Sequence, residues 1–222
     1  MTLAGPPSSP ALRGKPLLRG VSHQVAFFAA LVATAALVAR SRSAAAGVAA
    51  TVFGASLVLL FGTSALYHRV HWAPAARQRM RRLDHAAIFV LIAGGYTPLF
   101  LLFPSSSGGH GALWAVWVGA GLGVLKSLVW VRAPKWITAL LGVGLGWTVA
   151  GQVFDRAAVV GGLTVGLLVA AGIIYSLGAA VYALRRPDPL PAVFGYHEVF
   201  HALVIVASAC LLAHVVRVMG AA

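Results

Sequence analysis

Acidic residues, and charged residues in general, are scarce in this 222-residue sequence. Only 4 residues are Asp or Glu, and 9% of the chain is charged, whereas a soluble domain carries roughly 25% charged residues. So few charges cannot cover the surface of a water-soluble protein of this length. The single cysteine, Cys210, also excludes an intrachain disulfide and any CxxC redox or zinc motif.

Seven long apolar runs take up most of the chain, which is 60% hydrophobic. Each run is close to the ~20 residues that a helix needs to cross ~30 Å of hydrocarbon, and none shows the alternation of a membrane β-strand. The runs are Val21–Ala39, Ala44–Leu66, Ala86–Phe103, Gly111–Val131, Trp136–Phe154, Ala157–Leu184 and Val199–Val216. We therefore predict an all-α, polytopic membrane protein whose residues 21–222 form a seven-transmembrane-helix bundle, preceded by a short basic disordered tail at residues 1–20.

The formal net charge is +13, and the basic residues sit mainly in short gaps between the apolar runs. In a soluble protein this charge would suggest nucleic-acid binding, but in a membrane protein basic gaps set the topology and contact anionic headgroups. Most Lys and Arg residues fall on the same side as the N-terminus, so the positive-inside rule predicts a cytoplasmic N-terminus. We expect membrane lipids as partners, with anionic headgroups at the cytoplasmic face, and no nucleic acid.

With that topology, three segments that are distant in sequence bring polar side chains to the same membrane leaflet. Polar residues inside membrane spans are costly and are therefore functional candidates. The candidates are Ser64 and His68 at the end of the second run, Asp84 and His85 before the third, and His197, Glu198 and His201 at the start of the last. Their convergence predicts a polar site within the bundle, near the cytoplasmic face.

The spacing of His197 and His201 suggests metal binding, because residues at i and i+4 share one face of a helix. Three imidazoles and a water form the usual open zinc site, and His68 is the natural third ligand. Asp84 is placed to hydrogen-bond the water on the metal or to orient a histidine, and Ser64 lies one turn before His68. Taken alone, Asp84 is also a good helix cap, and Ser64 is also a simple packing residue.

The other histidines have weaker claims to a functional role. His85 adjoins Asp84 but points about 100° away from it on a helix. His23 and His110 are expected to be interfacial residues at the starts of the first and fourth runs, and His214, far from the predicted site, is given no role.

The segment from His197 to His201 literally matches HExxH, the zinc-protease motif in which the Glu is a general base. Such enzymes usually have a third ligand downstream, often acidic, and no Asp or Glu follows Glu198. An intramembrane metalloprotease is therefore only an alternative, and the role of Glu198 stays open.

Three separated motifs resemble those of the hemolysin III family, a bacterial branch of the progestin and adiponectin Q receptors that is related to alkaline ceramidases. Ser64–His68 resembles its S-x-x-x-H motif, Leu83–Pro98 its third-helix signature, and His197–His201 its last-helix motif. The resemblance implies a seven-helix fold with a cytoplasmic N-terminus. It also implies a zinc ion held by His68, His197 and His201, with Asp84 near the metal's water and Ser64 close by.

The predicted function is a zinc-dependent integral membrane hydrolase in the bacterial inner membrane, with Asp84 and Ser64 as catalytic residues. It would act on a ceramide-like lipid amide or an ester and serve membrane-lipid homeostasis. A non-enzymatic sensor or receptor with a structural zinc ion is the alternative from a different class. A cytolysin, as the name of the family suggests, is a lesser alternative.

Overall fold

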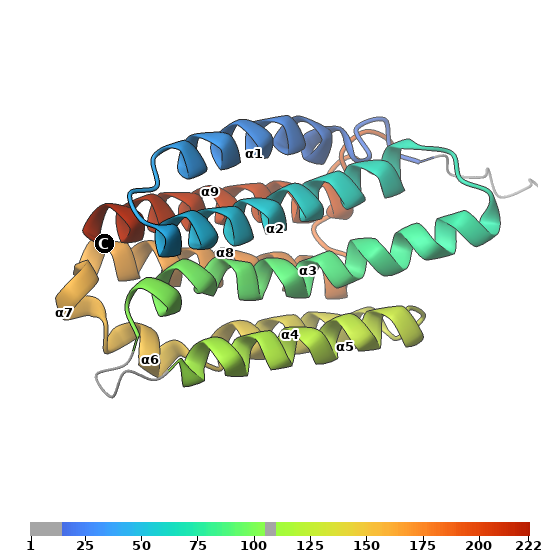
Figure 1. Cartoon of the computed structure of the whole chain (residues 1–222). Helices are drawn as coiled ribbons and strands as arrows, with labels where there is room; N and C mark the ends of the chain where they lie inside the picture. Colours follow the sequence, from blue (N-terminus) through green and yellow to red (C-terminus); the bar gives the residue numbers. More distant parts are fainter. Residues whose placement is uncertain (1–14, 105–109) are drawn as a thin grey trace, which may run out of the picture.

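Residues 15–104 and 110–222 are described by the computed structural model, and these residues form nine α-helices (Figure 1). Their bounds are α1 Val21–Ala39, α2 Ala44–Arg69, α3 Pro74–Leu102, α4 Gly111–Val129, α5 Lys135–Trp147, α6 Ala150–Phe154, α7 Ala157–Val160, α8 Gly162–Leu184 and α9 Tyr196–Ala221. Seven stretches are long and apolar enough to cross a membrane, with α5 and α6 together forming one of them. The predicted all-α bundle of seven transmembrane helices is confirmed.

Two of the predicted runs are interrupted in the structure. The run from 136 to 154 divides into α5 and α6, and the run from 157 to 184 divides into the single turn α7 and the long helix α8. Gly161, between α7 and α8, has a φ of 87°, a conformation that glycine adopts without the steric cost of a Cβ atom. The apolar pattern continues across both breaks, so hydropathy alone could not reveal them.

Helix α3 begins at Pro74, twelve residues before the predicted start at Ala86. Proline suits the first turn of a helix because its missing N–H would have no partner there. The following residues are basic or polar and favour a helix without being apolar. The basic side chains assigned to a gap therefore lie on an extension of α3. Helix α9 likewise begins three residues early, at Tyr196.

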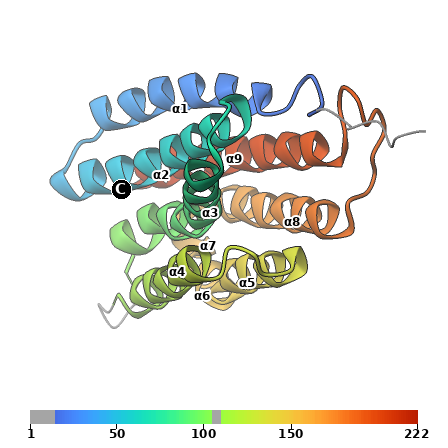
Figure 2. The same ribbon diagram turned by 90° about the vertical axis from the view of Figure 1, so that its right-hand side faces the viewer.

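The seven long elements pack side by side around α3 and α9. In chain order, α1 packs on α2, α2 on α3 and α3 on α4, while α5 packs on α8 and α8 on α9. Contacts of α9 with α1 and of α3 with α9 close the arrangement, and Figure 2 shows α1 and the α4–α5 pair on opposite sides of it. Large apolar side chains remain exposed on its outer faces, such as Val32 (72%) and Trp114 (71%). Lipid is the solvent that suits such a surface.

The end of the bundle that carries the start of α1 and the α8–α9 connection is called the histidine end below. Of the predicted tail at residues 1–20, residues 1–14 lie outside the described part of the chain. Residues 17–20 form turns, and the backbone of this segment pairs with the α8–α9 connection. Leu17 N–H donates to Ala192 O at 3.0 Å, and Leu18 N–H donates to Val193 O at 3.2 Å. This pairing joins the segment before α1 to the segment before α9.

Candidate metal centre

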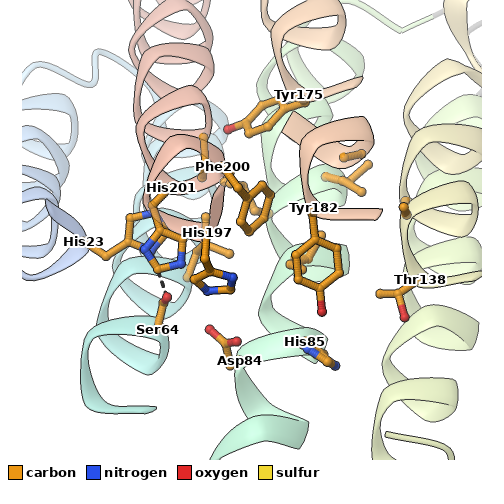
Figure 3. Close-up of a pocket in the computed structure, with 18 of the residues that line it drawn as sticks. His23, Ser64, Asp84, His85, Thr138, Tyr175, Tyr182, His197, Phe200 and His201 are labelled. Carbon is orange, nitrogen blue, oxygen red and sulfur yellow. Dashed lines mark hydrogen bonds between the residues drawn. The ribbon is translucent and has the colours of Figure 1, made fainter. Parts of the chain in front are cut away.

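The three histidines that the sequence predicts as metal ligands lie together at the histidine end. His68 comes from the last turn of α2, whereas His197 and His201 come from the first two turns of α9. One ligand atom from each ring can be chosen so that all three lie within 4.8 Å of one another. The Nε2 atoms of His68 and His197 are 3.1 Å apart. Figure 3 shows the rings of His197 and His201 turned toward a common space in the pocket.

The donor set fits a zinc ion. Zn–N bonds of about 2.0–2.1 Å in a tetrahedral site place two ligand nitrogens roughly 3.3 Å apart, close to the 3.1 Å found between His68 and His197. Neutral imidazoles suit several divalent ions, so three close histidines establish a possible metal site rather than the identity of the metal. His68 and His201 are also buried, which protects such a site from competing water.

Asp84 lies inside α3, ten residues after the helix begins, so its interpretation as a helix cap is wrong. The early start of α3 places this carboxylate in the wall of the pocket instead of at a helix end. Figure 3 shows Asp84 on the same side of the pocket as His197, with its oxygens directed toward the histidine cluster. Among the described residues that line this pocket, Asp84 is the only carboxylate.

Ser64 contacts a histidine that sequence reasoning assigned to the interface. The Nδ1 atom of His23 lies 2.8 Å from the Ser64 hydroxyl, and the His23 ring stacks on His201 with centroids 3.8 Å apart and planes 7° apart. His23 is 3% exposed, so its predicted interfacial position is wrong. The signal was present in the sequence, because His23 begins a helix at the same leaflet as His68 and Asp84.

Glu198 is the central acid of the HExxH match, and its two oxygens are engaged away from the metal ligands. One forms an ion pair with the Arg19 guanidinium, and the other accepts the Gly195 N–H at 2.9 Å. The carboxylate therefore satisfies a free N–H at the start of α9 and anchors the segment before α1. These contacts give Glu198 a structural role and weigh against a protease base.

His85 lies in the pocket although it follows Asp84 by one residue. Its side chain is 8% exposed, and its Nδ1 atom is buried without a hydrogen-bond partner among the described residues. Figure 3 places it beneath Tyr182, across the pocket from His201. The pocket is wide enough for two side chains that point about 100° apart on α3 to face the same space.

The pocket has a volume of about 380 Å³ and is lined by residues of α1, α2, α3, α5, α8 and α9. This volume is within the ~300–1,000 Å³ range of small-molecule sites. Its apolar part is formed by side chains such as Leu91, Ile92 and Val143, and Trp147 and Tyr175 also line it. The candidate metal site therefore opens into a largely apolar space inside the membrane-spanning bundle.

Three further histidines lie outside this pocket: His71, which is exposed between α2 and α3, His110 and His214. His110 caps α4, with its Nδ1 atom 3.3 Å from Phe100 O. His214 is fully buried on α9, and its Nδ1–H donates to Thr164 O at 2.8 Å. Sequence reasoning gave His214 no role, and its partner shows a link between α9 and the start of α8.

Comparison with known proteins agrees with the arrangement of helices and histidines. A family model described as Haemolysin-III related matches residues 13–212. The chain is 32% identical to "Hemolysin-3" of Bacillus cereus over 169 residues, which cover 76% of this chain and 74% of that protein. It is also 32% identical to the "Hemolysin-3 homolog" of Bacillus subtilis (strain 168) over 173 residues, covering 76% of this chain and 78% of the relative. The chain therefore belongs to the haemolysin-III related family of multi-pass membrane proteins.

Proposed function

We propose that this protein is a zinc-dependent membrane hydrolase that cleaves an amide or ester bond of a lipid. The observation that carries the proposal is the cluster of His68, His197 and His201, which shares one pocket with Asp84. Three histidines are typical of catalytic zinc sites, which keep a fourth position open for water or substrate. A purely structural zinc site normally fills that position with a protein ligand.

The residues of the pocket have separate roles in the proposed hydrolysis. When bound, a zinc ion supplies Lewis acidity toward a lipid carbonyl and makes water acidic enough to act as a nucleophile near neutral pH. Asp84 accepts the proton of the attacking water and delivers a proton to the leaving group. Ser64 holds His23 through its hydroxyl, and His23 in turn supports the plane of His201. Such supporting contacts fix the orientation of metal-binding histidines.

The substrate reaches the site from the bilayer. A largely apolar pocket among membrane helices accommodates acyl chains, so ceramide-like and acyl lipids are the proposed class, and membrane-lipid homeostasis is the proposed role. The excess of basic residues at the histidine end supports a cytoplasmic orientation of this end in the inner membrane of a bacterial cell.

A lipid-hydrolysis screen on purified protein tests this proposal. The protein should release fatty acid when loaded with zinc, lose that activity after chelation and regain it when zinc is restored. His68→Ala should remain inactive at every zinc concentration. Bound zinc without hydrolysis of any amide or ester lipid in the screen would contradict the hydrolase proposal.

A sensor or receptor with a structural zinc ion is the second candidate, and the direct exposure of Asp84 to the histidine cluster favours it. If Asp84 binds the metal itself, the fourth position is closed. X-ray absorption of the zinc-loaded protein separates the two proposals. Three nitrogen ligands with an exchangeable oxygen support the hydrolase, whereas a carboxylate ligand that is lost in Asp84→Ala supports the sensor.

The printed names of the two Bacillus proteins suggest a third candidate, a cytolysin. Purified protein should then lyse erythrocytes or leak dye from vesicles at low concentration. We expect no lysis, because the apolar outer faces of the bundle suit a protein that resides in its own membrane.

A further inference from the structure

The mouth of the pocket at the histidine end is strongly cationic. Five basic side chains line it, from the segment before α1, from the first turns of α3 and from the start of α5. They are Lys15, Arg19, Arg77, Arg81 and Lys135. Asp84 is the only acidic side chain among the described lining residues. The mouth therefore carries a large excess of positive charge next to a low-dielectric interior.

Little of this charge is neutralised by the protein. Within the described residues, Arg19 has the sole ion pair, with Glu198. The Lys135 amine instead contacts the Tyr196 hydroxyl at 2.8 Å and lies 4.5 Å from the centre of the Tyr182 ring. Burial lowers the pKa of Lys15 below its usual value, and the charges of Arg77 and Arg19 lower it further. Cations that repel one another at a cavity entrance favour an anion from outside the chain.

A topology signal alone does not explain this placement. Basic residues that only orient a membrane protein need to lie in the aqueous layer, not around one cavity. Arg79 provides the contrast, because it lies on the same turns of α3 as Arg77 and Arg81 and is exposed as Arg77 is, but does not line the pocket. Arg77 and Arg81 are four residues apart, so they share one face of α3.

The other end of the pocket is apolar, and the residues that line it on α5 include glycines and an alanine. Along α5, Ala139, Gly142 and Gly146 are spaced so that they share a face, and all three line the cavity. A Cβ atom added at Gly146 would have no neighbour within 4 Å, and one at Gly142 would meet only Ile92, at 3.9 Å. The space beside these glycines is therefore open cavity, not packed protein.

The spacing of the lining residues along α3 gives the length of the cavity. Arg81 at the mouth and Tyr96 at the far end both line it, and fifteen residues of helix between them span about 22 Å. That length exceeds half of the ~30 Å hydrocarbon core, the depth that the acyl chains of one leaflet fill. Asp84 lies between these two residues, near the mouth, so the candidate metal site adjoins the junction of the cationic and apolar parts.

We propose that the pocket binds an anionic, long-chain acyl lipid, with its negatively charged group at the cationic mouth and its chain along the glycine face of α5. Arg77 and Arg81 recognise the anion, and Gly142 and Gly146 set the length of chain that fits. The inference narrows the substrate class of the proposed hydrolase to anionic acyl lipids, and it rests on that function only for turnover. Guanidinium groups suit this role because they bind phosphate or carboxylate oxygens with two parallel hydrogen bonds.

Equilibrium binding of oleoyl lysophosphatidate and of monoolein to the purified, zinc-loaded protein tests the role of charge, because the two lipids differ in the phosphate. The wild type should bind lysophosphatidate at least about tenfold more tightly. The double variant Arg77→Gln/Arg81→Gln should lose this preference and keep its affinity for monoolein, whereas Arg79→Gln should resemble the wild type.

Three results would overturn the assignment of the anion site. Equal affinity for the two lipids would show that the pocket does not recognise charge. An equal loss in Arg79→Gln would reduce the effect to general surface electrostatics. Displacement of lysophosphatidate by an equal concentration of inorganic phosphate would show a site for free phosphate rather than for a lipid.

Chain length is tested with Gly146→Leu and the control Gly144→Leu. Gly144 likewise has no neighbour within 4 Å of an added Cβ atom, but it is exposed on α5 and does not line the pocket. Gly146→Leu should bind oleoyl lysophosphatidate at least about tenfold more weakly and keep its affinity for the octanoyl form. Equal behaviour of the two glycine variants would contradict the proposed path of the chain.

These measurements need no turnover, so the two proposals fail separately. The same binding experiments on Asp84→Asn, which removes turnover and the only carboxylate among the described lining residues, should give a preference for the anionic lipid at least as strong as that of the wild type. Hydrolysis of neutral lipids without that preference would leave the hydrolase standing and remove the anionic substrate class. Selective binding of the anionic lipid without any hydrolysis would keep the anion site, remove the hydrolase and favour a lipid sensor.

Discussion

Two buried histidines on α9, His201 and His214, have opposite surroundings. They are 2% and 0% exposed and lie about 20 Å apart along the helix. His201 stacks on His23, lies beside His68 and His197, and lines the pocket. His214 donates to Thr164 O, and Arg217 donates to the Thr164 hydroxyl at 3.1 Å, so both side chains tie α9 to the first turn of α8.

The difference teaches that burial of a polar side chain inside a membrane bundle does not identify a functional site. A buried imidazole that donates to a backbone carbonyl offsets its own desolvation and stabilises the contact between two helices. Buried imidazoles whose nitrogens face one another across a cavity lack such partners and can bind an ion together. Convergence on a cavity is therefore the more informative feature, and each prediction below tests it.

The largest expected effect is on lipid turnover, and it compares Asp84 at the histidine end with Asp155 at the opposite end of the bundle. Asp84→Asn should lower lipid turnover by about 10²–10⁴-fold, because it removes the group that transfers protons, while the zinc content stays unchanged. Asp155 ends α6 at the opposite end of the bundle and is exposed, so Asp155→Asn should keep the wild-type rate. Equal rates for wild type and Asp84→Asn, measured as released fatty acid, would remove Asp84 from the mechanism.

Metal removal should change the melting temperatures of the His201 and His214 variants differently. A ligand present at 100 times its dissociation constant stabilises the folded state by about 2.7 kcal/mol. A chelator should therefore lower the melting temperature of the wild type and of His214→Ala. His201→Ala has lost a proposed ligand, so the chelator should leave its melting temperature unchanged. A chelator-induced shift in His201→Ala equal to that of the wild type would contradict the assignment of His201.

His214→Ala should destabilise the fold without affecting the metal. The substitution removes the buried hydrogen bond from the imidazole to Thr164 O, a loss of about 0.5–1.5 kcal/mol. His214→Gln supplies an amide donor at the same position and should recover part of that loss. The measurement is thermal unfolding in detergent, with zinc content determined on the same samples. Loss of zinc in His214→Ala would break the distinction between the two ends.

Ser64→Ala should have the smallest effect of this series. It removes the hydrogen bond to His23, which supports His201 by stacking. Loss of a supporting contact around a metal site lowers affinity by about 10–100-fold, and we expect the lower value because Ser64 acts through two rings. Zinc affinity measured by competition with a chromophoric chelator should therefore fall about tenfold. A loss as complete as that in His201→Ala would make Ser64 a ligand rather than a support.

The fold was largely readable from the sequence because hydropathy sets the length of each membrane span. The predicted helix boundaries were wrong where a helix extends beyond the hydrocarbon core of the membrane. The polar first turns of α3 remain helical in water, where an apolar pattern cannot mark them, and this left a helix cap as an alternative interpretation of Asp84. The break at Gly161 was also hidden, since it depends on a backbone angle.

The histidine cluster was predictable because three ligand-type residues fall at one leaflet once the topology is assigned. His23 was missed although it satisfies the same condition, because a single histidine at the start of a span is typical of an interface. Glu198 and Arg19 could not be paired from the sequence, since 179 residues separate them and only the folded segment before α1 brings them together. The pocket itself, with Arg77 and Gly146 at its two ends, required the packing of six helices.

The metal content of detergent-purified protein tests the central claim most directly. The wild type should contain about one zinc ion per chain. That ion should be lost in His68→Ala, His197→Ala and His201→Ala and kept in His214→Ala. Absence of stoichiometric metal from the wild type after zinc is supplied, or equal retention in all four variants, would contradict a metal centre at the histidine end.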